Sequence, residues 1–270
     1  MSLDTLLQNP NALPSAPKVV EELISSFDNP SVSVEEIARK LASDPVLSAK
    51  LLRLANSAYY HVSRSIGSVD DAVRMLGFVT VRTLVISSGL VGGFKNVPGM
   101  DLKQFWRYSL HTAVAAKWIA KKSGDNTDLA FTIGMMHAIG QLVIRTGATA
   151  MALEVDALAG PYDPRRMEEE KPLLGYTYAE VGAELAVRWK FPEVFAETIR
   201  HFPAPAERMA SVIHLASWRA LAEHNKVDAA GLKASLPADV VHRMGLEEEL
   251  LLEEMPALGE LAAGLEELVH

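Results

Sequence analysis

Four histidines between residues 99 and 225 are the residues best suited to chemistry. His111 and His137 fall in the middle of apolar helical patterns, His201 ends another such pattern, and His214 lies inside a further one. Imidazoles that converge from different helices can hold a metal ion in the core of a bundle. The other interpretation is that each is a core histidine satisfied by one or two hydrogen bonds, because no short ligand motif such as His-x-x-x-His is present.

Composition excludes several other chemistries. The chain of 270 residues has no cysteine, so disulfides, thiolate metal sites and cysteine nucleophiles are impossible. Its net charge of −8 disfavours general nucleic-acid binding, which depends on Lys and Arg. The N-terminal residues lack the basic and apolar regions of a secretory signal, and Val79–Phe94 is interrupted by polar residues. We therefore expect a soluble, cytoplasmic protein without a membrane span.

The elements that must position these histidines are helices. Amphipathic patterns predict helices over residues 101–122 and from 126 or 127 to about 145, and Thr177 with Glu180 forms a capping box for a third. Residues 79–90 are apolar almost all round and predict a buried helix, although their β-branched content leaves a strand open. No segment shows sustained two-residue alternation. The fold class is therefore all-α and multi-helical.

Gly and Pro residues indicate where the chain divides into separate helical regions. Gly92-Gly93 to Pro98-Gly99 is the strongest boundary, and the helical pattern restarts at Asp101. We expect an N-terminal helical lobe over residues 1–98, a second lobe over 99–225, and an acidic helical extension over 226–270. Three patterns in the first lobe predict helix N-termini: Ser33 with Glu36, Asp44-Pro45, and Ser68 with Asp71.

An extended pattern resembles the HDOD (HD-related output domain) family of bacteria. The first lobe carries Leu51-Leu-Arg-Leu-Ala-Asn-Ser-Ala-Tyr-Tyr60 and Ile66-Gly-Ser-Val-Asp-Asp-Ala-Val73. The second carries Phe105-Trp-Arg-Tyr-Ser109 and Ala179-Glu-Val-Gly-Ala183. The resemblance covers most of residues 1–225. It implies an HD-like helical core, related to phosphohydrolases that hold one or two metals through His and Asp, in the second lobe.

The same resemblance implies where the metal ligands of those relatives would stand. His111 matches the first histidine and His137 the histidine of the His-Asp pair, with Ala138 in the place of its aspartate. Tyr178 and Ser217 stand where a further histidine and the closing aspartate would be, and His201 matches the first residue of a frequent His-His pair. Both aspartates are thus replaced, in a set made up of His111, His137, Ala138, Tyr178, His201 and Ser217.

Hydrolysis at such a centre needs several ligands, usually with carboxylates, to hold the ion and activate its water. We therefore expect a degenerate site with no cofactor, and a non-catalytic signal-transduction protein that acts through contacts with unknown protein partners. His111, His137, Tyr178 and His201 are the candidate lining of a small-ligand pocket between the lobes. The alternative is a divergent phosphohydrolase for a nucleotide or phosphodiester, with Glu180 or Glu184 replacing the lost aspartates.

The C-terminal extension offers one further candidate surface. Leucines and a methionine follow one possible helical stripe: Leu250, Leu251, Met255, Leu258, Leu261 and Leu265. This stripe either packs on its own domain or forms a partner-binding helix, through which the chain could form a homodimer.

Overall fold

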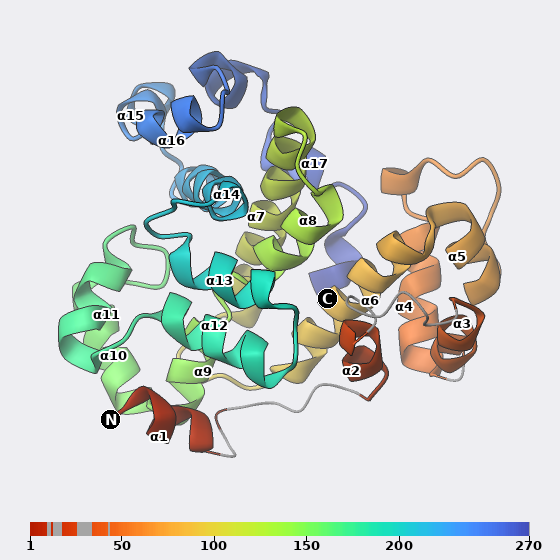
Figure 1. The fold of residues 1–270 in the computed structure, drawn as a ribbon, viewed down its shortest axis with the longest axis horizontal. Helices are drawn as coiled ribbons and strands as arrows, with labels where there is room; N and C mark the ends of the chain where they lie inside the picture. Colours follow the sequence, from red (N-terminus) through yellow and green to blue (C-terminus); the bar gives the residue numbers. More distant parts are fainter. Residues whose placement is uncertain (10–11, 13–17, 26–33, 43, 270) are drawn as a thin grey trace.

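The computed structural model describes residues 1–9, 12, 18–25, 34–42 and 44–269. Within them every regular element is a helix and there is no strand, so the predicted all-α fold class is confirmed (Figure 1).

The first group of helices lies at the right of Figure 1. It consists of α2 (Lys18–Ser25), α3 (Val34–Ala42), α4 (Pro45–Ala55), the short η1 (Ala58–Tyr60), α5 (Val69–Leu76) and α6 (Phe78–Gly93). Asp44 caps α4 and Ser68 caps α5 through their side chains, as predicted, whereas Ser33 lies outside the described residues. Residues 79–90, for which a strand was the alternative prediction, belong to helix α6, which is buried over most of its length.

The second group is built around a long central helix. Its helices are α7 (Leu102–Ser123), α8 (Thr127–Met136), α9 (Gly140–Gly147), α10 (Thr149–Leu158), α11 (Arg166–Leu174), α12 (Tyr178–Arg188), α13 (Glu193–His201) and α14 (Arg208–His224). Asp101 caps the start of α7, and Gly124 in the left-handed conformation ends it. Helix α7 packs between α8 and α14, and α12 packs on α13 and α9. The capping box of Thr177 and Glu180 starts α12 as predicted.

The helix predicted from residue 126 or 127 to about 145 is interrupted at His137. Helix α8 ends at Met136 and α9 begins at Gly140, with i→i+3 hydrogen bonds of the 3₁₀ type from the amides of Ile139 and Gln141. The Nδ1 atom of His137 lies 2.7 Å from the carbonyl oxygen of Gly134. In an uninterrupted α-helix that carbonyl would accept the amide of residue 138. The His137 ring thus takes the position at the Gly134 carbonyl that a backbone amide would occupy in a continuous helix.

Two glycines bring helices unusually close around this turn. A Cβ atom on Gly140 would collide with the backbone carbonyl oxygen of Tyr178, and one on Gly134 would lie 2.6 Å from the Cα of Ala113. Helix α9 therefore rests directly on the start of α12, and α8 rests on α7. These contacts hold His137 between helices that come from three parts of the sequence.

The C-terminal extension is broken into short pieces rather than one helix. These are α15 (Ala229–Ala234), α16 (Ala238–Arg243), the π-helix η2 (Leu250–Glu254), α17 (Leu258–Leu261) and the 3₁₀ helix η3 (Glu266–Val269). Figure 1 shows α15 and α16 above α14, and the chain then returns to the centre of the molecule. There α17 packs on α7, and η3 contacts α4, α6 and α7.

The apolar stripe of this extension is largely used inside the chain. Leu251, Met255, Leu258 and Leu265 are buried, whereas Leu250 and Leu261 are partly buried against the same core. The interpretation that the stripe packs on its own domain is therefore the one the structure bears out.

Two further features bear on the predicted organisation. Helix α1 (Leu3–Gln8) packs on α9, so the N-terminal end lies against the second group of helices rather than the first. The stretch Thr127–Gly147 is long and apolar enough to cross a membrane by composition, and the bent pair of α5 and α6 would also qualify if taken as one span. Of the qualifying window within Thr127–Gly147, 83% is buried inside the protein.

Candidate functional site

His137 lies at the centre of the candidate site, and both of its ring nitrogens are occupied by the protein. The side chain is fully buried. Nδ1 lies 2.7 Å from the Gly134 carbonyl, which can only accept, so Nδ1 carries the proton and donates. Nε2 lies 3.0 Å from the hydroxyl of Tyr108 and accepts its hydrogen bond. Burial lowers the pKa of His137 to about 4, so the ring is neutral near pH 7.

The residue that faces His137 from helix α7 is Tyr108 rather than His111. The two lie three positions apart, and sequence comparison favoured the histidine for its side-chain type. Tyr108 is buried, and its ring packs edge-on against His137 with 5.1 Å between centroids. Burial raises the pKa of its hydroxyl, which therefore stays a neutral donor. The sequence did contain a signal for Tyr108: it is a hydroxyl-bearing residue one helical turn before His111.

His111 lies in a different place. Its Nδ1 atom is 3.8 Å from the Glu223 carboxylate, in a small polar cavity of about 230 Å³ that Arg107 and His224 also line. Burial lowers the pKa of His111, and the nearby Glu223 opposes that shift. His111 therefore lines a different cavity, to which His137 does not contribute.

Tyr178 and Ser217 line a second, larger cavity of about 430 Å³, with Tyr108 in its wall. Phe202 lies between this cavity and His137, whose ring it contacts edge-on at 5.6 Å between centroids. The hydroxyl of Ser217 donates to the backbone carbonyl of His214. The cavity thus gathers residues at or beside three of the positions where the HD relatives would carry ligands.

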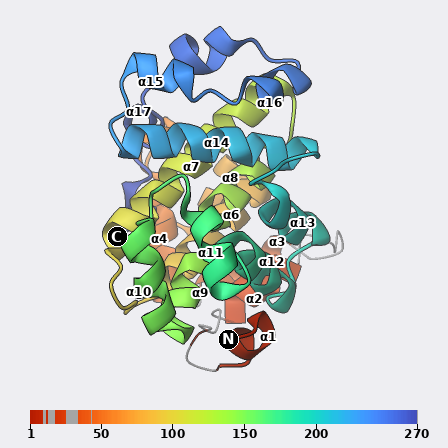
Figure 2. The same ribbon diagram turned by 90° about the vertical axis from the view of Figure 1, so that its left-hand side faces the viewer.

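His201 points away from this cavity. Its side chain is 52% exposed, and its Nδ1 atom lies 3.4 Å from the carboxylate of Glu197 on the same helix. Of the four residues expected to line one pocket, the structure brings His137 and Tyr178 to one region and places His111 and His201 elsewhere. The cavity is lined mainly by residues of α7, α11, α12, α14 and the α15 segment, all of them after residue 98. Figure 2 shows α14 between the α15 segment above it and α11 and α12 below it.

The side chains at this centre do not fit a metal ion. Ala138 is fully buried and supplies no donor, Ser217 is a neutral hydroxyl, and the nitrogens of His137 are both engaged. The carboxylates that could have replaced the aspartates are committed to other partners. Glu180 binds Lys171 and Glu184 binds Arg200. Across the described residues, no group of three or more His, Asp or Glu side chains is arranged to hold a metal.

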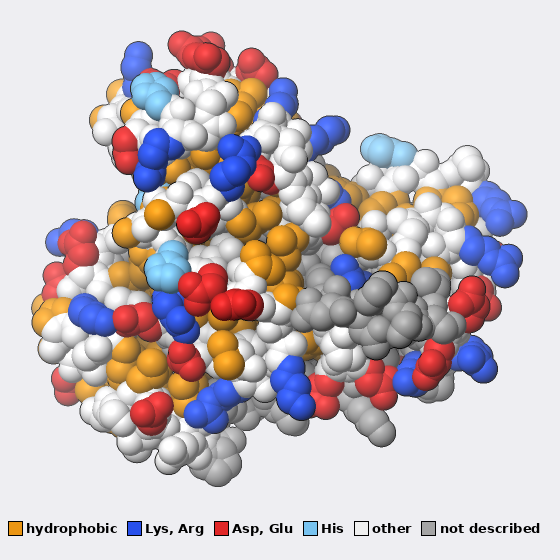
Figure 3. Space-filling view, in the orientation of Figure 1, with side chains coloured by type: hydrophobic (Ala, Val, Ile, Leu, Met, Phe, Trp, Pro, Cys, Tyr) orange, Lys and Arg blue, Asp and Glu red, His pale blue; other side chains and the backbone are white. Residues whose placement is uncertain are grey.

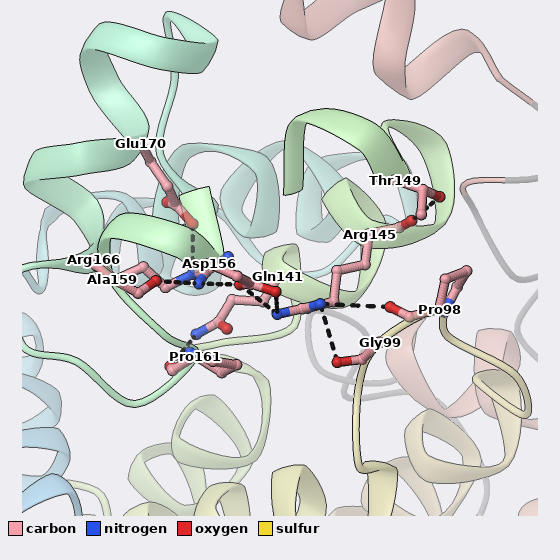
Figure 4. Close-up of polar contacts among 10 residues, drawn as sticks. All are labelled: Pro98, Gly99, Gln141, Arg145, Thr149, Asp156, Ala159, Pro161, Arg166 and Glu170. Atoms are coloured by element: carbon pink, nitrogen blue, oxygen red, sulfur yellow. Dashed lines mark hydrogen bonds and ion pairs between the residues drawn. The ribbon is translucent and has the colours of Figure 1, made fainter. Parts of the chain in front are cut away.

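A buried network of charged groups borders the cavity, and the sequence did not reveal it (Figure 4). Arg145 donates to the carbonyl of Gly99 in the linker between the helix groups and to both oxygens of Asp156. Arg166 donates to Asp156 at 2.8 Å and to Glu170 at 2.9 Å.

The network continues into helix α12. The second oxygen of Glu170 accepts the backbone amide of Tyr178 at 2.7 Å. Arg166 and Glu170 stand four residues apart on α11, a spacing that indicates an ion pair. Their burial, and the bridging by Asp156 from α10, could not be inferred from that spacing. The network joins the linker, α9, α10, α11 and α12 into one unit.

The all-helical core with this arrangement is that of the HD-like class of proteins, and comparison with known proteins identifies the family. The HDOD domain model matches residues 13–205. Because this match covers more than half of the chain, the chain belongs to the HDOD family.

Solved structures agree with this assignment. A protein from Shewanella amazonensis named "Putative phosphohydrolase" is 34% identical, with a TM-score of 0.79 over 98% of this chain and 97% of its own. An HDOD domain protein of unknown function from Geobacter sulfurreducens is 26% identical, with a TM-score of 0.70 over 99% of this chain and 91% of its own. An uncharacterised protein of Treponema pallidum is 25% identical over 76% of this chain, which spans only 41% of that protein's length.

Proposed function

We propose that this HDOD protein is a non-catalytic regulatory protein that acts in signal transduction through contacts with other proteins. The observation that carries the proposal is the sealed state of His137. Nδ1 is protonated and donates to Gly134, and the lone pair of Nε2 accepts the hydrogen bond of Tyr108, so neither nitrogen is free to bind an ion. The adjacent Ala138 offers a methyl group where a carboxylate would be required.

The chemistry of hydrolysis supports the same conclusion. A metal-dependent phosphohydrolase needs an ion to polarise the phosphoryl oxygen and to activate water near neutral pH. The cavity wall is mostly apolar, and its charged groups are already paired: Asp163 with Arg165, and Arg166 with Asp156 and Glu170. The imidazole of His214 is also in the wall, and its Nδ1 atom lies 2.8 Å from the carbonyl oxygen of Phe202. Burial raises the pKa of both tyrosine hydroxyls, Tyr108 and Tyr178, so neither supplies an anionic ligand near pH 7.

A phosphohydrolase remains the second candidate, because a relative at 34% identity carries that name. Hydrolysis of bis(4-nitrophenyl) phosphate with Mn²⁺, Zn²⁺ or Fe²⁺ separates the two functions. We expect no activity above buffer with any of the ions. The triple variant Tyr108→His, Ala138→Asp and Ser217→Asp returns ligand side chains and is the matched gain-of-function comparison. Metal-dependent activity in the natural chain that His137→Gln abolishes would refute the proposal.

The partner is expected to be a protein rather than nucleic acid. The net charge is −8, and the face in Figure 3 shows acidic and basic side chains intermixed without a broad basic patch. Affinity capture of the tagged chain from its native host, followed by reciprocal capture with the recovered protein, tests this half of the proposal. Failure to recover any stoichiometric protein under conditions in which the chain is expressed would contradict it.

A further inference from the structure

The cavity that replaces the metal centre has the features of a binding site for an organic molecule. It measures about 430 Å³, within the range of small-molecule pockets. Aromatic and aliphatic side chains form most of its wall, among them Phe202, Trp218, Leu221 and Met167. The indole nitrogen of Trp218 donates to Ser235, which fixes that ring at the edge formed by α14 and the α15 segment. Such a wall suits an apolar, ring-sized body.

Two polar groups in this wall have hydrogen-bonding capacity left for a ligand. Tyr178 lines the cavity, and its hydroxyl makes no hydrogen bond to a described residue. Arg166 is 2% exposed and also lines the cavity. Its Nε and Nη1 atoms bind Glu170, Asp156 and Ala159, which leaves Nη2 to donate. Both donors belong to the wall of the same cavity, so one acceptor group of a ligand could bind the two together.

The two donors are close enough to influence each other. Burial raises the pKa of the Tyr178 hydroxyl, Glu170 adds to the rise, and Arg166 opposes it. The phenol therefore remains a hydrogen-bond donor at ordinary pH. Phe202 packs beside its ring at 6.4 Å between centroids, so the hydroxyl is held in place next to the apolar wall.

Charged groups of both signs lie in and behind the wall. Arg145 and Arg166 share the Asp156 carboxylate. Burial raises the pKa of the fourth member, Glu170, to about 7, and Arg166 opposes that rise. The Asp163 carboxylate also lines the cavity, and it is paired with Arg165. Arg166 is the Lys or Arg side chain that the described part of the cavity wall contains, so an anion would bind beside its Nη2 atom.

We propose that this cavity binds a small organic anion: a ring-sized apolar body that carries one carboxylate or sulfonate group. The anionic oxygens accept hydrogen bonds from Nη2 of Arg166 and the hydroxyl of Tyr178, and the body packs against Phe202, Trp218 and Leu221. The inference is independent of the proposed function, because it rests on the cavity wall and not on the absence of catalysis.

Two fluorescent probes that share one aromatic body test it. 8-Anilinonaphthalene-1-sulfonate carries the anion, and N-phenyl-1-naphthylamine is the same body without it. We expect the sulfonate to bind the natural chain at least tenfold more tightly, the effect of one charge-assisted hydrogen bond of at least about 1.4 kcal/mol. Aliphatic and aromatic monocarboxylates should displace it, and their amides should not.

Three variants locate the binding. Tyr178→Phe should weaken the sulfonate about tenfold and leave the neutral probe unchanged, since only the hydroxyl is removed. Tyr176→Phe is the matched control, because the buried hydroxyl of Tyr176 has no hydrogen-bond partner among the described residues and Tyr176 does not line this cavity. Ser217→Leu places a larger side chain in the wall and should abolish binding of both probes. Near-ultraviolet circular dichroism verifies that each variant keeps its fold.

Four results would contradict the proposal. Equal binding of the two probes would show that the anionic group contributes nothing. Binding that persists in Ser217→Leu would place the probes elsewhere on the surface, and no binding of either probe to the natural chain would show that the cavity takes no such ligand. Equal effects of Tyr178→Phe and Tyr176→Phe would contradict the assignment of the donor.

Discussion

Replacement of His137 by glutamine should remove a specific part of the acid sensitivity of the fold. The folded pKa of His137 is about 4 because the ring is buried, whereas a histidine in an unfolded chain titrates near 6.5. Between these values the unfolded chain binds more protons than the folded chain, so lowering the pH favours unfolding. The stabilisation is complete above about pH 6.5 and declines until about pH 4.

The magnitude follows from the two pKa values. The full effect is about 3 kcal/mol, and about 2 kcal/mol of it falls between pH 7 and pH 5. Glutamine keeps a donor and an acceptor of similar reach but does not titrate. As the pH falls from 7 to 5, the free energy of unfolding of His137→Gln should therefore rise by about 2 kcal/mol relative to that of the natural chain.

Urea unfolding at a series of pH values, followed by circular dichroism, measures this difference. Titration of all other groups cancels in the comparison, because both chains share them. A difference that stays constant from pH 7 to pH 5 would refute the reasoning. It would mean that His137 is protonated or solvent-accessible in the folded protein, and the sealed geometry would be wrong.

Three other substitutions test the packing that encloses the site. Gly140→Ala should cost about 3 kcal/mol or more in urea unfolding, because its Cβ would meet the carbonyl oxygen of Tyr178. Asp156→Asn should cost about 3–5 kcal/mol, because it leaves two buried guanidinium groups without their shared carboxylate. Leu258→Ala should cost about 2–5 kcal/mol without changing the elution volume in size-exclusion chromatography, since Leu258 is buried within its own chain.

Each of these has a matched control on the surface. Gly160→Ala adds a methyl group with no atom within 4 Å, Asp163→Asn removes a carboxylate paired with the exposed Arg165, and Leu153→Ala truncates a side chain that is 52% exposed. All three should change stability by less than about 1 kcal/mol. Losses as large as those of the buried positions would show that the burial assigned here is wrong. A shift to a smaller species in Leu258→Ala would favour the dimer interpretation of the C-terminal stripe.

Local signals predicted the helices of this fold well. Asp44, Ser68 and Thr177 cap the helices that follow them, because their side chains satisfy amides two or three residues away. The break after Met136 was not predictable in this way. It accompanies the hydrogen bond from the His137 ring to the Gly134 carbonyl, and the orientation of that ring is also set by Tyr108 of α7, which no local pattern specifies.

The resemblance to the HDOD family proposed His111, His137, Tyr178 and His201 for one site. The choice of His111 over Tyr108 could not be corrected without the rotation of α7 relative to α8. His201 was chosen for its type, and its exposure follows from the orientation of α13. Arg145 and Asp156 lie on different helices, so their pairing is a consequence of tertiary packing. Sequence patterns specify faces of helices, whereas these contacts depend on how the faces meet.

Elemental analysis of the purified chain tests the central claim most directly. The protein would be expressed in medium supplemented with Mn, Fe and Zn salts and purified without chelators and without a histidine tag. The account predicts far less than one transition metal per chain, because His137 is sealed and Ala138 supplies no ligand. About one metal per chain, lost in His137→Gln, would contradict it.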